Sequence, residues 1–304
     1  MKRRDLFRLA AGSLLLWPAW LLSGCSDQRS RLELLYAASL IRLIEQELGP
    51  AFARQTGIKL EGEARGSLAA ARLVQDGSRR PDLLIVADPR VLQTVLTAAQ
   101  VPRYALFAAN SMVITYRPGS AYALAIKAGR SWYQALQAPG LRLGRSDPEL
   151  DPLGYRALLV LQLAQRYYRQ PGLLRKIIKP DQLYPEAQLM AQLESGQLDA
   201  AFVYRNMSSD HHLPFSALPP EIDLSDPARQ AEYRQAAYTD RQGVIHRGAP
   251  IIYAAAPLAK APHPQAARRF TDFLGSEPAQ KIMTQNGFLV WPDFPLWRSW
   301  GEFS

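Results

Sequence analysis

The stretch that decides the fold is LELLYAASLIRLIEQELGPAFARQTGIKLEGEARGS, residues 32–67. Its first eight residues form an apolar run that predicts a strand, and residues 40–57 carry apolar side chains at helical spacing. Residues 59–67 then alternate between polar and apolar positions, which predicts a second strand. A strand, a helix and a strand in this order indicate an α/β fold with parallel strands.

The same alternation continues along the chain. Residues 68–77 predict a helix, and PDLLIVADP at residues 81–89 is continuously apolar, as a buried parallel strand is. Residues 110–118 open a second region, which contains a long helical pattern after Asp151 and an apolar strand at residues 198–205. This region supplies the second half of the predicted α/β fold.

The C-terminal part continues the alternation of predicted strands and helices. Residues 249–257 predict a further apolar strand, and two amphipathic helices follow, ended by Gly275 and Gly287. The segment between residues 207 and 246 is rich in Pro and Ser and poorly periodic. We expect loops with short helical pieces there.

Length and charge limit the classes of function. A chain of 304 residues is long enough for two lobes of roughly 100–150 residues each. The formal net charge is +9, of which residues 1–25 contribute three positive charges. The remaining excess suits an anionic ligand or a membrane surface. No basic stripe with interleaved aromatic residues is present, so we expect no nucleic-acid partner.

The N-terminus predicts export. Residues 1–25, MKRRDLFRLAAGSLLLWPAWLLSGC, combine a basic start with an apolar run that is shorter than the roughly 20 residues of a membrane span. Residues 22–25, LSGC, resemble a bacterial lipobox, in which Cys25 is lipidated and becomes the first mature residue. The alternative is a signal anchor with an incidental cysteine. RRDLF at residues 3–7 also fits a twin-arginine signal, and the sequence leaves open that route or the general one.

Two turns predict an anion site. In YAASL and EARGSL, a strand leads into a Ser that opens a helix, at Ser39 and Ser67. A Ser at an N-cap leaves backbone N–H groups and the positive end of the helix dipole facing the carboxyl end of the strand. Ligands of open parallel sheets bind at that edge. The alternative is that each Ser only caps its own helix.

The sequence shows no motif for catalysis, for a nucleotide cofactor or for a resident metal ion. His211 and His212 are adjacent, while His246 and His263 are isolated, and none has a cysteine partner, so we expect no resident metal ion. A nucleophile elbow, a dinucleotide fingerprint and a P-loop are absent from the sequence. We therefore predict a binding protein without a cofactor, not an enzyme.

Two acidic residues stand at predicted helix starts. Asp151 precedes Pro152 at the head of the long helical pattern, and Glu186 follows Pro185 at the head of EAQLMAQLESG. The usual preference for acidic residues at helix N-termini explains both, because such residues cap the helix or complement its dipole.

Several of these segments together resemble the molybdate/tungstate-binding lipoproteins of ABC importers, in the branch first described from archaea. The resemblance covers residues 32–290 and rests on YAASL, EARGSLAAARLV, DPLGYRALLVLQLAQRYY, LESGQLDAAFVYRNMS, LPPEIDLSDP and GAPIIYAAAP. It implies an α/β, two-lobed type II periplasmic-binding-protein fold with two crossover strands, NSMVITY and APIIYAA. After a signal peptide at residues 1–25, lobe 1 would comprise residues 31–114 plus 250–304, and lobe 2 residues 115–249.

The resemblance also implies a set of oxyanion ligands. Position by position, these contacts fall on Ala38, Ser39, Ser67, Asp151, Pro152, Leu153, Glu186 and Tyr204. Ala38 stands where the family has Gly, which matters if that turn requires a positive φ angle. The family's two carboxylates, here Asp151 and Glu186, approach the tungsten or molybdenum centre and extend its coordination towards six. That is the only metal ligation expected, and with it the Asp151 carboxylate should face the cleft.

The implied function is an exported, lipid-tethered receptor that captures tungstate or molybdate and delivers it to the transmembrane subunit of an ABC permease. We expect a monomer. Three alternatives remain: a receptor for another tetrahedral oxyanion such as sulfate or phosphate, an exported two-lobed enzyme, and a sensor that signals without transport. Asp151 and Glu186 disfavour sulfate and phosphate, because like charges about 4 Å apart repel by roughly 4 kcal/mol at an effective dielectric constant of 20.

Overall fold

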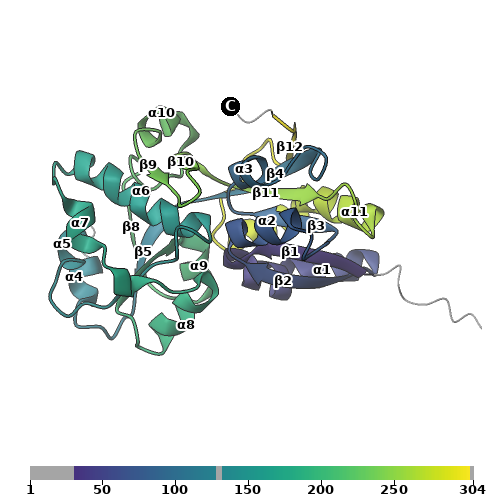
Figure 1. Ribbon diagram of the computed structural model, residues 1–304. Helices are drawn as coiled ribbons and strands as arrows, with labels where there is room; N and C mark the ends of the chain where they lie inside the picture. Colours follow the sequence, from purple (N-terminus) through teal and green to yellow (C-terminus); the bar gives the residue numbers. More distant parts are fainter. Residues whose placement is uncertain (1–30, 128–131, 302–304) are drawn as a thin grey trace, which may run out of the picture.

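The computed structural model describes residues 31–127 and 132–301, which form two α/β lobes, each built on its own sheet (Figure 1). The predicted signal peptide and Cys25 lie outside the described residues. Within the two described ranges, no helix combines the length and apolar character that a membrane span requires.

Lobe 1 contains a six-stranded sheet in the order β12-β4-β11-β3-β1-β2. The strands β1, β2 and β3 pair in parallel, as the sequence predicts, while β4, β11 and β12 join them through antiparallel pairings. All four residues of β3 are buried, which explains its continuously apolar sequence. The strands are β1 (Arg31–Ala37), β2 (Lys59–Arg65), β3 (Leu83–Val86), β4 (Arg103–Asn110), β11 (Ile251–Pro257) and β12 (Leu296–Ser299).

Helices cover this sheet on both sides. They are α1 (Gly49–Thr56), α2 (Ser67–Gln75), α3 (Arg90–Val95), α11 (Pro264–Leu274) and α12 (Glu277–Gln285). The rings of Phe52, Phe270 and Phe273 lie 5.1–6.1 Å apart between centroids and join α1 to α11. Such aromatic pairs add to the stabilisation from apolar burial.

The segment predicted as one helix at residues 40–57 has three parts. A 3₁₀ turn, η2 (Ala38–Leu40), precedes a π-helical turn, η3 (Leu43–Leu48), and only then does α1 begin. Pro50 has no N–H to donate to the preceding turn, and the N–H of Gly49 bonds to Ile44 five residues back. A Cβ at Gly49 would lie 2.5 Å from the Ile44 carbonyl oxygen, so this change of register requires glycine.

Lobe 2 contains a four-stranded sheet in the order β6-β7-β5-β8 and a separate hairpin of β9 and β10. The strand β8 falls within the segment that the sequence predicted as loop. The strands are β5 (Met112–Tyr116), β6 (Leu143–Gly144), β7 (Ala200–Tyr204), β8 (Phe215–Ala217), β9 (Ala237–Thr239) and β10 (Ile245–Arg247).

The helices of lobe 2 are mostly short, apart from α6 (Pro152–Tyr167), whose first turn faces lobe 1. The others are α4 (Ala123–Lys127), α5 (Trp132–Ala135), α7 (Leu173–Ile177), α8 (Leu189–Glu194), α9 (Arg205–Asp210) and α10 (Gln230–Tyr233). Three 3₁₀ turns complete the lobe: η4 (Pro180–Gln182), η5 (Glu186–Gln188) and η6 (Pro227–Arg229).

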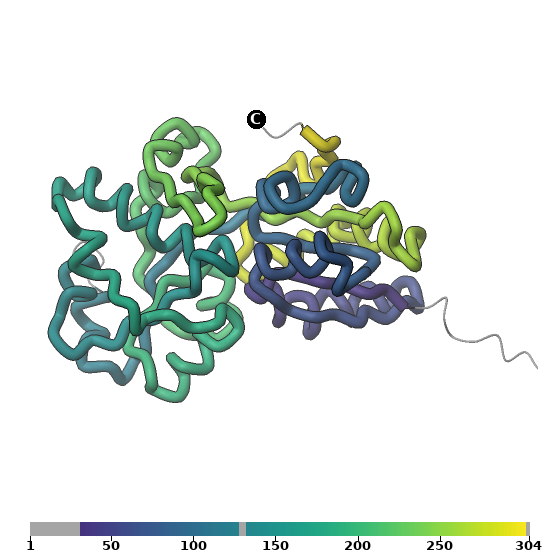
Figure 2. Tube along the Cα trace, viewed as in Figure 1, coloured from purple at the N-terminus to yellow at the C-terminus, as the bar shows by residue number. Residues whose placement is uncertain are grey.

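The chain passes between the sheets at two neighbouring points (Figure 2). It leaves lobe 1 between β4 and β5 at Ser111 and returns between β10 and β11. Met112, Val113 and Ile114 pair with β7 of the second sheet, so the expected boundary between residues 114 and 115 is three residues too late. The Asp223 and Leu224 carbonyls accept the N–H groups of Met112 and Ile251, which ties both passages to one loop.

Candidate functional site

A cavity of about 440 Å³ lies between the two lobes. Lobe 1 contributes Ala38 and Gly66 to its lining, and lobe 2 contributes Ser146, Asp151 and Glu186. Of the eight residues predicted to bind the oxyanion, Ala38, Asp151 and Glu186 line this cavity, and the other five are buried.

The two lobes touch closely beside this cavity. The backbone N–H of Ala69 donates to the Leu150 carbonyl over 3.1 Å. A Cβ on Gly66 would lie 2.6 Å from that same carbonyl oxygen and 2.8 Å from the Asp151 Cβ. Gly66 has φ of −59°, so glycine is required there for the close approach of the lobes and not for the backbone angle.

Asp151 is the N-cap of α6. Its Oδ1 accepts the N–H of Gly154 over 2.9 Å, and its Oδ2 accepts the hydroxyl of Ser146. Only 2% of the residue is exposed, and burial raises the pKa of its carboxyl to about 6, although the Ser146 hydroxyl opposes that shift. The carboxylate therefore turns towards its own helix while the residue also lines the cleft, which corrects the expectation that it faces only the cleft.

Glu186 begins the 3₁₀ turn η5 and is 4% exposed. Its Oε1 is buried without a hydrogen-bond partner. Burial and the nearby charge of Asp151 raise the pKa of this carboxyl well above its usual value, while Ser39 and Arg156 act in the opposite direction. A buried carboxyl oxygen without a hydrogen-bond partner is costly, which makes Glu186 a candidate ligand-binding residue of the cleft.

Ser39 lies next to this pair, on lobe 1. Its hydroxyl is 3.2 Å from the hydroxyl of Tyr253, and its carbonyl accepts the side-chain N–H of Asn206 over 2.8 Å. The preceding residue, Ala38, belongs to a 3₁₀ turn and is not among the described residues with positive φ. The turn thus accommodates an alanine at residue 38.

Neither predicted Ser is an N-cap, which corrects the sequence interpretation. Ala37 precedes η2 and Gly66 precedes α2, each with the extended ψ angle of a cap position (131° and 138°). The Ser residues fall inside the first turn, where their hydroxyls bond elsewhere. The Ser67 hydroxyl accepts the N–H of Ala87 over 3.0 Å and so fixes the end of β3.

The remaining predicted residues are buried beside the cleft. Pro152 and Leu153 form the first turn of α6 behind Asp151. Tyr204 ends β7 and is fully buried, and its hydroxyl oxygen accepts a hydrogen bond from Arg156 over 2.8 Å. Burial raises the pKa of the Tyr204 hydroxyl well above its ordinary value, so it stays protonated.

A charged cluster that sequence reasoning missed joins the lobes behind the cleft. Asp88, at the end of β3, accepts the hydroxyl of Tyr155 over 2.8 Å and bonds to the guanidinium of Arg90. Arg156 Nη2 lies 3.2 Å from Asp88 Oδ2. Burial opposes ionisation of Asp88, but the charges of Arg90 and Arg156 hold the pKa of its carboxyl well below the usual range. The signal in the sequence was Arg156 itself, a cation inside the apolar run GYRALLVL.

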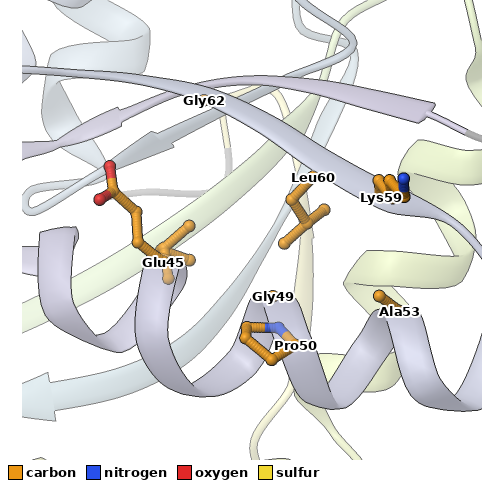
Figure 3. A pocket seen from close by; sticks show the side chains of 8 residues that line it. Glu45, Gly49, Pro50, Ala53, Lys59, Leu60 and Gly62 are labelled. Carbon is orange, nitrogen blue, oxygen red and sulfur yellow. The ribbon is translucent and has the colours of Figure 1, made fainter.

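A second cavity, of about 300 Å³, lies on lobe 1 outside the cleft, between the π-helical turn, α1 and β2 (Figure 3). Among the residues that line it, Glu45 and Lys59 carry charged groups, and Glu45 accepts the hydroxyl of Tyr36 over 2.6 Å. Across the described residues, no group of three or more His, Cys, Asp or Glu side chains has the arrangement of a metal site. The interlobe cleft is therefore the candidate site.

Solved structures with similar folds support this architecture. The periplasmic molybdate-binding protein of Azotobacter vinelandii superposes with a TM-score of 0.63 at 19% identity, covering 85% of this chain and 99% of that protein. The sulfate-binding protein SubI of Mycobacterium tuberculosis gives a TM-score of 0.59 at 15% identity, over 86% of this chain and 88% of SubI. These matches confirm the predicted two-lobed α/β fold.

Relatives in sequence are closer. A Haloferax volcanii protein, provisionally named an ABC transporter molybdenum-binding protein, is 39% identical over 83% of this chain and 81% of its own length. The molybdate/tungstate-binding protein WtpA of Thermococcus kodakarensis is 30% identical over 86% of this chain and 82% of its own length. These relatives confirm the family resemblance and the prediction of a binding protein rather than an enzyme. The profile of the family described as bacterial extracellular solute-binding protein matches residues 32–289, and the chain belongs to that family.

Proposed function

We propose that this protein captures molybdate or tungstate in the cleft between its lobes and delivers the oxyanion to an ABC permease. The names of the relatives at 39% and 30% identity support this ligand class. The observation that carries the proposal is the carboxyl pair of Asp151 and Glu186, both buried at one cleft, with Glu186 Oε1 lacking a hydrogen-bond partner.

The carboxyl pair argues for a metal-centred oxyanion. Two buried carboxylates repel sulfate or phosphate, which offer only negatively charged oxygens to them. Tungsten(VI) and molybdenum(VI) are hard centres that accept further oxygen ligands, which carboxylates provide. In this proposal Asp151 and Glu186 each supply one oxygen to the metal centre, and no other residue ligates it.

Donors for the oxo groups come from both lobes. In the proposed complex, the hydroxyls of Ser39 and Tyr204, backbone N–H groups near Ala38 and the first turn of α6 donate to the anion, with Pro152 and Leu153 forming that turn. The positive end of α6, a helix of 16 residues, favours an anion at this position. Ser67 supports the site by holding the N–H of Ala87. A ligand held from both lobes stabilises the closed arrangement of the cleft.

Titration calorimetry of the purified protein with tungstate, molybdate, sulfate and phosphate tests the proposal. We expect Kd values below micromolar for tungstate or molybdate and no measurable heat with sulfate. Sulfate or phosphate binding of comparable strength would replace the proposal with a receptor for ordinary tetrahedral oxyanions. Failure to bind any of the four ions would reject an oxyanion receptor altogether.

For the cellular arrangement we propose an extracytoplasmic, monomeric receptor tethered to the membrane through a lipid on Cys25. The family's extracellular character and the LSGC segment support this location. Expression of the full chain with a radiolabelled fatty acid tests the tether. Label should appear on the wild type and be absent from Cys25→Ala, whereas equal labelling of both, or none on the wild type, would reject Cys25 as the anchor.

A further inference from the structure

Arg156 is a buried cation between the two lobes that the proposed ligand set does not use. It is 1% exposed and lies on the first turns of α6, one residue after Tyr155. Its Nη1 donates both to the Ala87 carbonyl of lobe 1 and to the Tyr204 hydroxyl of lobe 2, each over 2.8 Å. A fully buried guanidinium is rare unless its surroundings or a ligand compensate its charge.

The hydrogen bond to Tyr204 has a defined direction. A guanidinium only donates, so the Tyr204 oxygen must accept, and its own proton is left to donate elsewhere. Among the described residues the Tyr204 hydroxyl is seen only as an acceptor, from Arg156, and Glu186 is near enough for its charge to act on this hydroxyl. The Arg156 hydrogen bond therefore occupies the Tyr204 oxygen as an acceptor and leaves the Tyr204 proton available to a ligand.

The same guanidinium also contacts lobe 1 at two neighbouring residues. Ala87 ends β3, and Asp88, the next residue, pairs with Arg156. When the lobes separate, Arg156 loses both partners, and with them the fixed position from which it donates to Tyr204. When they close, both lobe 1 contacts hold the guanidinium in the position from which it donates to Tyr204.

We propose that Arg156 is a positioning residue that fixes the Tyr204 hydroxyl as a hydrogen-bond donor to the bound oxyanion and makes this orientation depend on closure of the two lobes. The inference rests on the proposed function. It assigns to Arg156 a role that acts through Tyr204 and not through direct ligation of the metal centre.

A double-mutant cycle on tungstate affinity tests this role. The variants are Arg156→Met, Tyr204→Phe and both together, each measured by titration calorimetry. A hydrogen bond to a charged group suggests about 10- to 100-fold weaker binding for each single variant. Because both act through one hydrogen bond, the double variant should bind no more than about threefold more weakly than the worse single variant.

Arg90→Met is the matched control. Arg90 also pairs with Asp88 and also reaches lobe 2, through the carbonyl of Arg247, but it does not contact Tyr204. In the double variant of Arg90→Met and Tyr204→Phe, the two fold-changes in tungstate Kd should therefore multiply. Arg156→Lys, which keeps a donor and a charge, should bind tungstate more tightly than Arg156→Met. If Arg156→Met does not unfold cooperatively, Tyr204→Phe alone tests the role, because wild-type tungstate affinity in that variant would reject it.

The outcomes separate the two proposals. If the wild type binds neither tungstate nor molybdate, the proposed function fails. If the wild type binds but the effects of Arg156→Met and Tyr204→Phe multiply as those of Arg90→Met do, the proposed function stands and the role of Arg156 is rejected. Equal tungstate affinity of Tyr204→Phe and the wild type would also reject that role.

Discussion

Asp151 and Glu186 line one cleft, and the charge of Asp151 adds to burial in raising the pKa of Glu186. The carboxylate of Asp151 accepts hydrogen bonds from the N–H of Gly154 and the hydroxyl of Ser146, while Glu186 Oε1 has no hydrogen-bond partner. The pair is thus asymmetric, because both oxygens of Asp151 accept hydrogen bonds whereas one oxygen of Glu186 has no partner. That asymmetry suits a site whose second carboxylate is satisfied only when a ligand arrives.

Binding of tungstate should release protons at pH 6. Burial raises the pKa of Asp151 to about 6, so this carboxyl is partly protonated there, and burial also raises the pKa of Glu186. Ligation requires the carboxylates, and the protons must leave. Calorimetry at pH 6 in two buffers of different ionisation enthalpy measures the number released. Identical apparent enthalpies in the two buffers would contradict ligation by the acids.

The contribution of Asp151 to stability without ligand should fall as pH rises from about 4 to 6. The folded-state pKa of Asp151 is raised from 3.8, so in this window the folded protein binds more protons than the unfolded chain, and deprotonation costs it stability. Asp151→Asn retains an acceptor for the N–H of Gly154, and its amide N–H can donate to the Ser146 hydroxyl oxygen, but it has no charge to bury. Across this pH window the melting temperature of the variant should therefore rise relative to that of the wild type. Parallel curves would contradict burial of the Asp151 charge.

Glu186→Gln should separate binding from folding. The amide keeps the size of the side chain and removes a buried charge, so the free energy of unfolding should be unchanged or higher. Tungstate binding should weaken by about tenfold or more because a metal ligand is lost, and discrimination against sulfate should shrink. Glu194→Gln, an exposed substitution on α8, is the control and should leave both quantities unchanged. Wild-type affinity in Glu186→Gln would remove Glu186 from the ligand set.

The sequence predicted the regular part of this fold because hydrophobic periodicity is strong there. Strands β1, β2 and β3 lie where their apolar or alternating runs indicated them. The π-helical turn was not predicted, since it depends on Pro50 shifting the hydrogen-bond register of an otherwise helical pattern. Strand β8 has three residues in a polar segment, which is too short for a periodic signal.

The candidate site was less accessible to sequence reasoning. Local grammar identified Asp151 as a helix cap, which the structure confirms, but the meeting of Asp151 with Glu186 followed from the family resemblance and not from any local pattern. The pairing of Asp88 with Arg156 arises only when the two lobes pack together. Contacts between lobes depend on the tertiary arrangement, and no single segment encodes them.

Gly66→Ala should prevent the lobes from closing fully. Its Cβ would meet backbone, the Leu150 carbonyl oxygen at 2.6 Å, and backbone cannot rotate away as a flexible side chain does. We expect tungstate affinity to fall by about tenfold or more and the radius of gyration with saturating tungstate, from small-angle scattering, to exceed that of the wild type. Gly119→Ala is the control, because its Cβ would approach only the Arg117 side chain, at 3.1 Å. A Gly66→Ala protein with the wild-type radius and affinity would show that the contact between Gly66 and Leu150 is not part of closure.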